Sequence, residues 1–327
     1  MTTQPAEQVE GVQGQFAGMP TPLYAASPSR LLAWLDCPRR YRMQYLDRPR
    51  PVPRPPRAHT SVGVATHNAL RDWWGLPDSR RTAAAGAGLV RASWVDAGFR
   101  DPGQSATWRE RVQAEVTAYL EGVEPARAPL GVERTVAFRT AALAVMGRVD
   151  RLDDRGGELV VVDYKTGRAP CTKEQARTSL PLALYAAAVW KMFRRRCVRV
   201  ELHHVPTAGV VGHSHTGQSL GRKVAEAESI ARDARRADAQ FALMGAGSPL
   251  FPPRLSPLCT WCDYRAHCPE GQAVGPEKSS WAALEESTHG RGTNEGGPVA
   301  VPDDRRGQPE GRRGQDDDGG QSRGGLR

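Results

Sequence analysis

Two short apolar segments, residues 142–152 and 158–164, restrict the fold more than any other part of the chain. Both are rich in β-branched residues and are bounded by Gly and Asp, which is typical of β-strands. We expect them to pair as a hairpin closed by residues 153–157. Alternate side chains share one face of a strand, and on the second strand that face carries Leu159, Val161, Asp163 and Lys165. A strand of Leu and Val therefore presents a carboxylate and an ammonium at its C-terminal end.

Asp150 lies near the end of the first of these strands, thirteen residues before Asp163, and the hairpin would bring the two side chains together. Two converging carboxylates form a hard-oxygen site that suits Mg²⁺ or Mn²⁺. Lys165 would then hold an attacking water molecule or offset the charge that builds on a phosphate. A structural Asp–Lys ion pair, or solvated hairpin ends, would explain an isolated Asp-X-Lys. The additional Asp150 in the same hairpin favours the functional interpretation.

The segments around the hairpin predict the rest of the fold. Ser27-Pro28 is a typical helix start, and apolar residues recur at helical spacing within residues 31–35, 62–73 and 108–119. Further elements are a strand at 132–139, a helix at 173–193, strands at 198–206 and 209–215, and a long helix at 220–244. This order predicts an α/β or α+β domain, with a small mixed sheet flanked by helices.

Charge is distributed unevenly along the 327 residues. Residues 21–274 hold 37 basic and 24 acidic side chains, a net charge of +13, whereas the whole chain carries +9. Only five of the 45 basic residues are Lys, and Arg forms bidentate contacts with phosphate. A nucleic-acid surface and a merely solvated excess of Arg explain this charge equally well.

The two ends of the chain differ from its middle. Residues 1–20 and 275–327 lack apolar periodicity and are expected to be disordered, which leaves one folded domain over residues 21–274. The Pro-rich residues 48–56 are expected to form an extended connector. The sequence has no run of 18 apolar residues, and its first twenty residues contain no Lys or Arg. We therefore expect no membrane span, no secretory signal and a cytoplasmic location, where the six cysteines would stay reduced.

Cysteines cluster near the end of the basic segment, at Cys259, Cys262 and Cys268, and Cys37 stands 222 residues before the first of them. Four thiolates hold either a Zn²⁺ ion or an iron–sulfur cluster, and the spacing alone leaves both open. The other two cysteines, Cys171 and Cys197, lie outside this pattern and are expected to be buried and unreactive.

The sequences GRVDRL at 147–152 and VVDYKTG at 161–167 resemble the core of the PD-(D/E)XK nucleases, in particular the RecB-like exonuclease branch. The resemblance implies a restriction-endonuclease-like core with Mg²⁺ or Mn²⁺ at the hairpin. The residue roles that it implies are metal binding by Asp150, Asp163 and the main-chain carbonyl of Tyr164, and assistance to the attacking water by Lys165.

Three further positions can be compared with this family. A His on an early helix joins the metal shell in RecB-like members, and His67, four residues after Gly63, matches it. Glu133 resembles a recurrent acidic position of the family, although a surface Glu on a strand explains it equally well. The family's Gln-x-x-x-Tyr motif is matched only at Tyr185, because Pro181 occupies the Gln position. This departure leaves Tyr185 as a packing or DNA-side residue.

The cysteines extend the resemblance. RecB-like nucleases of the AddB kind, and CRISPR-adaptation exonucleases, carry one Cys before the nuclease core and three after it, which together hold a [4Fe–4S] cluster. The matching residues are Cys37, Cys259, Cys262 and Cys268. The resemblance thus covers roughly residues 23–271 and implies a structural latch between the region of Cys37 and residues 255–270, with zinc as the alternative at the same cysteines.

The function that the resemblance implies is a metal-dependent DNA nuclease, a single-strand-directed or end-directed exonuclease of DNA repair or recombination. Candidates for its DNA path are Arg39, Arg40, Arg42 and Arg148. No GxxxxGK[ST] motif occurs in the sequence, so we expect the protein either to find single strands or ends itself or to use a helicase in trans. Two alternatives stay open: a CRISPR-adaptation-type exonuclease, and a non-catalytic iron–sulfur module that binds DNA and uses the hairpin only structurally.

Overall fold

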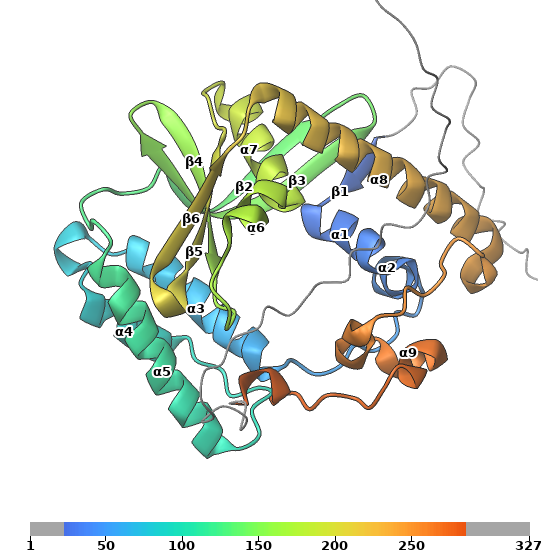
Figure 1. The fold of residues 1–327 in the computed structure, drawn as a ribbon, viewed down its shortest axis with the longest axis horizontal. Coiled ribbons are helices and arrows are strands. Elements are labelled where there is room, and N and C mark those ends of the chain that lie inside the picture. Colours follow the sequence, from blue (N-terminus) through green and yellow to red (C-terminus); the bar gives the residue numbers. More distant parts are fainter. Residues whose placement is uncertain (1–22, 286–327) are drawn as a thin grey trace, which may run out of the picture. The chain divides into compact units, whose positions relative to one another are not determined.

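The structure is a computed structural model that describes residues 23–285 (Figure 1). The disorder that we predict for residues 1–20 and 286–327 concerns residues outside this range. Among the described residues, no helix is both long and apolar enough to cross a membrane.

Six strands form one mixed sheet. They are β1 (Tyr24–Ala26), β2 (Gly131–Arg139), β3 (Leu143–Arg155), β4 (Glu158–Lys165), β5 (Arg199–His204) and β6 (Gly209–Ser214). The order along the sheet is β1-β3-β4-β5-β6, and β2 also pairs with β3. The β1–β3 and β4–β5 pairs are parallel, and the other three pairs are antiparallel. This architecture confirms the predicted mixed sheet flanked by helices.

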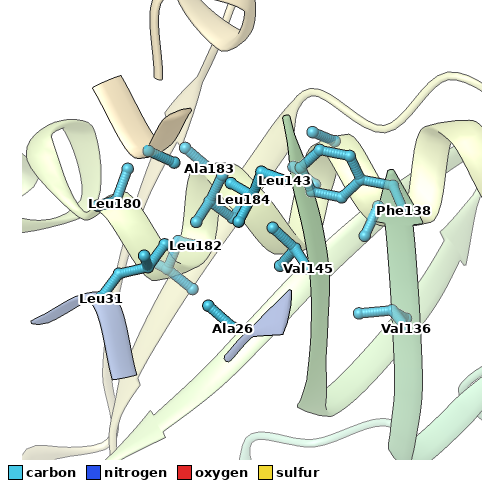
Figure 2. Close-up of a cluster of buried hydrophobic side chains, with 14 of the residues drawn as sticks. Ala26, Leu31, Val136, Phe138, Leu143, Val145, Leu180, Leu182, Ala183 and Leu184 are labelled. Atoms are coloured by element: carbon cyan, nitrogen blue, oxygen red, sulfur yellow. The ribbon is translucent and has the colours of Figure 1, made fainter. Parts of the chain in front are cut away.

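Nine α-helices accompany the sheet in the described part of the chain. They are α1 (Pro28–Asp36), α2 (Pro38–Tyr45), α3 (Ala58–Trp74), α4 (Ala83–Ala92), α5 (Pro102–Glu121), α6 (Lys173–Thr178), α7 (Leu180–Phe193), α8 (Gly217–Met244) and α9 (Pro269–Ala273). Helices α1, α7 and α8 contribute to one hydrophobic core against the sheet, part of which is drawn in Figure 2. Helices α3, α4 and α5 contribute to a second core. The sheet is therefore buried by helices on both faces.

The central hairpin divides its side chains between the two cores. Leu159 and Val161 pack in the first core, and Val160, Val162 and Tyr164 pack in the second, as the alternation along β4 predicts. The hairpin loop is shorter than the expected 153–157, because β3 continues to its residue 155 and only two glycines make the turn. Both glycines have positive φ angles, 63° and 94°, which a residue with a Cβ atom rarely adopts.

The helix predicted over residues 173–193 is divided into α6 and α7 at Ser179. The Ser179 hydroxyl accepts a hydrogen bond from the Leu182 N–H group, and Pro181 lies in the first turn of α7. Ser at an N-cap followed by Pro starts a new helix, so the prediction of one continuous helix is wrong.

The folded part of the chain also extends further than the expected residue 274. Leu284 is buried and Trp281 is partly buried against the second core, so residues 275–285 are not the disordered segment that we predicted. The Pro-rich connector 48–56 has no helix or strand, as expected. It is fixed to the C-terminal segment, because the Arg54 N–H group donates to the Asp263 carbonyl at 2.9 Å.

Candidate metal centre and cysteine cluster

The hairpin register places the two predicted carboxylates opposite each other. The last pair at this end of the β3–β4 ladder is Arg151 with Val162, and Asp150 and Asp163 are the next residue on each strand. The Tyr164 N–H group donates to the Asp150 Oδ2 atom at 2.8 Å. This hydrogen bond holds one carboxylate across the end of the hairpin, as the sequence predicts.

His67 reaches the same place from α3. Four apolar residues of this helix pack in the protein interior, namely Val62, Ala65, Ala69 and Trp73. His67 lies on another side of this helix, and its Nδ1 atom is 3.5 Å from the Asp150 Oδ1 atom. His67, Glu133 and Asp150 each offer one ligand atom, and these atoms all lie within 4.8 Å of one another. Such a set of one imidazole and two carboxylates fits a divalent cation.

Glu133 joins this group from β2 in an unusual backbone conformation. It lies between two residues that pair with β3, in the position opposite Asp150, and its φ angle is 48°. Positive φ is costly for a residue with a Cβ atom, and such strain concentrates at functional sites. The exposed Arg148 side chain lies with its Nε atom 2.9 Å from the Glu133 Oε2 atom. The structure thus places Arg148 directly beside the acidic group.

Asp163 and Lys165 form an ion pair next to this group. Burial raises the pKa of Asp163 above its usual value, and the charge of Asp150 adds to this effect, although the Lys165 ammonium opposes it. Burial alone would lower the pKa of His67, but the hydrogen bond and charge of Asp150 outweigh it and raise this pKa. The negative charge of Asp150 contributes to both shifts, and a bound cation would neutralise this charge. The residues present therefore fit a divalent metal ion.

Tyr185 and Gly147 are in close contact beside the acidic group. A Cβ atom on Gly147 would lie only 2.5 Å from the Tyr185 Cε1 atom. Burial raises the pKa of Tyr185 to about 12, and the charges of Asp163 and Asp150 contribute. Tyr185 therefore packs on the hairpin within the field of both carboxylates, although the family's Gln partner is replaced by Pro181.

The four predicted cysteines line one cavity of about 270 Å³. Cys37 lies between α1 and α2, Cys259 lies in a 3₁₀ turn, Cys262 directly follows that turn, and Cys268 directly precedes α9. The structure thus brings together residues that are more than two hundred positions apart. Of the other two cysteines, Cys197 is fully buried as expected, whereas Cys171 is partly exposed.

Three of the arginines that we expected on a DNA path lie on α2, near the cysteines. Arg39 and Arg40 line the cysteine cavity, and Arg39 pairs with Glu270 of α9 at 2.6 Å. Arg42 pairs with Asp47 at 3.1 Å. The ion pairs of Arg39 and Arg42 fix these two side chains to their surroundings, and the contact of all three arginines with DNA stays a prediction.

A mixed sheet flanked by helices, with a histidine and carboxylates gathered at the end of its central hairpin, defines an α/β protein with a candidate metal site. The sequence as a whole identifies it further, because the PD-(D/E)XK nuclease superfamily matches residues 25–269. The chain therefore belongs to the PD-(D/E)XK nuclease superfamily.

Comparison with solved structures gives more distant similarities. A crystal structure of a candidate exonuclease from Eubacterium rectale has a TM-score of 0.43 and 8% sequence identity, and the match covers 66% of this chain and 82% of that one. The crystal structure of SSO0001 has a TM-score of 0.32 and 14% identity, with coverage of 77% and 88% respectively. No curated protein sequence matches the chain. The assignment to the superfamily rests on the sequence match.

Proposed function

We propose that this protein is a metal-dependent DNA nuclease that removes nucleotides from single strands or from DNA ends in repair or recombination. The observation that carries the proposal is the convergence of His67, Glu133 and Asp150, with Asp163 and Lys165 beside them, at the end of one hairpin. This group lies in a folded segment whose net charge is strongly positive. A cation site within positive surroundings is what hydrolysis of a polyanion requires.

Each residue of the candidate site has a separate role in the proposed hydrolysis of the phosphodiester bond. A divalent ion held by His67, Glu133, Asp150 and Asp163 would supply Lewis-acid stabilisation of the phosphate and a more acidic water. Lys165, whose side chain is about half exposed, would hold the attacking water and offset charge on the phosphate. Arg148 is mostly exposed beside Glu133, where it would contact a neighbouring phosphate. The main-chain carbonyl of Tyr164 stays the predicted additional ligand.

The proposal is tested by incubating the purified protein with end-labelled single-stranded and double-stranded DNA, with and without Mn²⁺. We expect digestion that needs the metal, and that is lost in Asp163→Ala. A labelled end released as mononucleotides identifies an exonuclease, and a closed circular strand serves as the matched substrate without ends. Tight DNA binding without cutting under any metal would contradict the proposal and favour a non-catalytic binding module.

We further propose that the four cysteines hold a [4Fe–4S] cluster. All four residues line one cavity, as a shared metal group requires. The proposal of a cluster rather than zinc rests on the resemblance of the four-cysteine pattern to that of AddB-type nucleases. Metal analysis of anaerobically purified protein distinguishes the two, since zinc without iron would contradict the cluster.

The cellular setting belongs to the same proposal. The protein would act in the cytoplasm on DNA, with a helicase in trans to supply single strands. A CRISPR-adaptation exonuclease is the second candidate, because the same arrangement of four cysteines around a nuclease core is typical of that group. If the protein alone digests DNA that has free single-stranded ends, no helicase partner is required for these substrates.

A further inference from the structure

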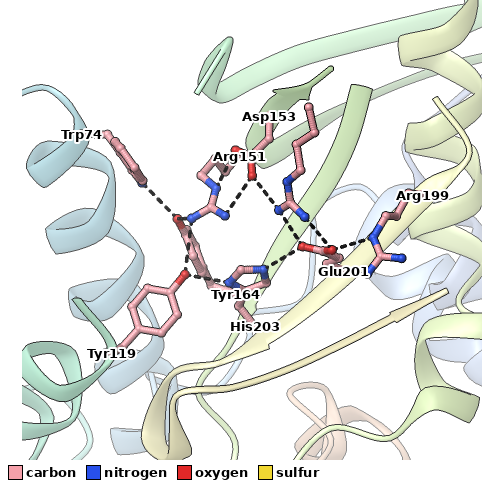
Figure 3. Close-up of polar contacts among 9 residues, drawn as sticks. Trp74, Tyr119, Arg151, Asp153, Tyr164, Arg199, Glu201 and His203 are labelled. Atoms are coloured by element: carbon pink, nitrogen blue, oxygen red, sulfur yellow. Dashed lines mark hydrogen bonds and ion pairs between the residues drawn. The ribbon is translucent and has the colours of Figure 1, made fainter. Parts of the chain in front are cut away.

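A group of buried polar side chains lies in the second core, on the face of β4 opposite Asp163 and Lys165 (Figure 3). At its centre is Tyr164, which stands between Asp163 and Lys165 on β4 but points to the opposite face of the strand. Its hydroxyl is 3.2 Å from the Trp74 Nε1 atom and 3.2 Å from a terminal nitrogen of Arg151. The side chain is 3% exposed, so these groups are its anchors in the protein interior.

Arg151 holds this group together from the other strand of the hairpin. It directly follows Asp150 and is 5% exposed. Its guanidinium forms an ion pair with Asp153 at 2.9 Å and donates to the Tyr119 hydroxyl at 3.3 Å. The two central members of the buried group, Arg151 and Tyr164, are thus direct chain neighbours of the carboxylates and the lysine of the metal centre.

Tyr164 also contacts the centre through space. Its main-chain N–H group donates to the Asp150 carboxylate at 2.8 Å, and the His67 ring meets the Tyr164 ring edge to face, with centroids 6.0 Å apart. Trp74 follows His67 by seven residues, two turns along α3, so both side chains lie on the same face of that helix. The hydrogen bond from Trp74 to the Tyr164 hydroxyl therefore fixes the helix that carries His67 to the strand that carries Asp163.

Filling this part of the core with apolar side chains would cost less desolvation free energy than burying these polar groups. Burying a guanidinium and phenol hydroxyls carries a desolvation cost that ion pairs and hydrogen bonds only offset. The apolar neighbours of the group include Val160 and Val162, and on its other side Tyr119 bonds the buried His203. The polar group is placed where three elements that carry the metal centre meet, namely α3, β3 and β4.

We propose that Tyr164 and Arg151 are positioning residues that preorganise His67, Asp150 and Asp163 for metal binding. The inference rests on the proposed function, and it assigns a role to side chains that would not touch metal or DNA. Partners that orient metal ligands from behind typically contribute about 10-fold to 100-fold in metal affinity. Loss of the Tyr164 hydroxyl should therefore weaken metal binding without unfolding the protein.

The test is calorimetric titration of the full chain with Mn²⁺ in the absence of DNA. Tyr164→Phe removes only the hydroxyl, and we expect Mn²⁺ to bind about tenfold more weakly. Arg151→Met should have an effect at least as large, and Tyr164→Phe alone keeps the proposal testable if Arg151→Met does not fold. The matched control is Tyr41→Phe, because Tyr41 is a fully buried phenol in the first core whose hydroxyl bonds Asp238 at 2.9 Å. This control should lose stability and bind Mn²⁺ as the wild type does.

The outcomes separate this inference from the proposed function. Equal Mn²⁺ affinity in Tyr164→Phe and the wild type, together with lost binding in Asp150→Asn, would overturn the positioning role and leave the metal site intact. An equal loss in Tyr164→Phe and Tyr41→Phe would also overturn it, because the effect would then follow general stability. If Asp150→Asn bound Mn²⁺ as tightly as the wild type, both the proposed metal site and the positioning role would be overturned.

Discussion

At the scale of single residues, the candidate site includes one position, Gly147, where the neighbouring side chains leave no room for a Cβ atom. Gly147 lies against the Tyr185 ring, and a Cβ atom there would also lie 3.2 Å from the Pro28 Cδ atom. Both neighbours are held by helices, α7 and α1 respectively, so neither can move without disturbing the first core. Packing therefore explains the Gly of the GRVD sequence, which lies three residues before Asp150 on β3.

We predict that Gly147→Ala destabilises the protein by about 1–3 kcal/mol, which is typical of overpacking in a well-packed interior. Urea denaturation measures this difference. The matched control is Gly88→Ala on α4, where nothing lies within 4 Å of the added Cβ atom. Because Ala is the better helix former, the control should be neutral or stabilising by up to about 1 kcal/mol. Equal stabilities for both variants would contradict the packing argument.

Lys165 should act on the reaction rather than on the metal. Lys165→Met removes the ammonium but none of the proposed ligands, so we expect the cleavage rate to fall by about 10²–10³-fold, as for loss of one charge-stabilising donor. Calorimetry should show Mn²⁺ binding retained. Lys173→Met, at an exposed position at the start of α6, is the matched control and should cut DNA normally. Wild-type cleavage by Lys165→Met would remove the residue from the mechanism.

At the scale of elements, the four cysteines of the cavity lie where parts of the chain outside the sheet meet. The connector before α3 contacts the C-terminal segment through the Arg57–Asp263 ion pair at 2.8 Å, and α2 contacts α9 through Arg39 and Glu270. These are partly exposed ion pairs, which individually contribute about 0–1 kcal/mol. A bound cluster would thus supply most of the stability of this junction.

Cys37→Ala should therefore lower the iron content and the stability together. Limited proteolysis should show faster cleavage within residues 255–285 in this variant, because the C-terminal segment loses its fourth anchor. Cys171→Ser, which changes a partly exposed cysteine outside the cavity, should keep the iron of the wild type. Unchanged iron in Cys37→Ala would remove Cys37 from the ligand set.

The strands β3 and β5 are also joined by a buried charge. Glu201 is 2% exposed and accepts hydrogen bonds from Arg155 and Arg199, and its carboxylate is 3.1 Å from His203. Burial alone would raise the pKa of Glu201, but these partners lower it well below its ordinary value. A carboxyl with a lowered pKa stabilises the fold above its unfolded pKa, about 4.3, and loses this contribution as the pH falls further.

Glu201→Gln should be less stable than the wild type by about 3 kcal/mol at pH 7, because it leaves its arginine partners without their buried counter-charge. The difference should narrow as the pH falls below about 4, because the Glu201 carboxyl of the unfolded wild-type chain then binds a proton that the native carboxylate, with its lowered pKa, does not bind. Urea denaturation across this range measures it. Glu226→Gln, which breaks an exposed pair with Lys223, should change stability by less than about 1 kcal/mol. A difference independent of pH would contradict the role assigned to the charge.

At the scale of the whole molecule, periodicity predicted the long elements and missed the short or weak ones. The hairpin and α3 carry clear patterns of alternate and helical burial, so both were predicted. β1 has three residues, and α4 has the sequence AAAGAGLVRA, whose two glycines and small side chains give little amphipathic contrast. The break at Ser179 shows the reverse error, because apolar residues continue across a helix start.

The candidate site was predictable only in part, for a similar reason. Asp150, Asp163 and Lys165 lie in one hairpin, where local register determines their proximity. The group around Tyr164 was not predicted, because Trp74 and Tyr119 lie far from the hairpin in the sequence. Trp74 is 90 residues from Tyr164, and its hydrogen bond depends on how α3 packs on the sheet. The sequence indicates this group only through the i to i+7 spacing of His67 and Trp74, which places both residues on one face of α3.

We propose that the side chains of His67, Glu133, Asp150 and Asp163 hold a divalent metal ion at the end of the hairpin. Anomalous diffraction from crystals of the protein grown with Mn²⁺ locates such an ion. We expect an anomalous peak among these four side chains, and no peak at this place in Asp150→Asn crystals. A fully occupied Mn²⁺ peak elsewhere in the protein, with none at the hairpin, would rule out this metal site.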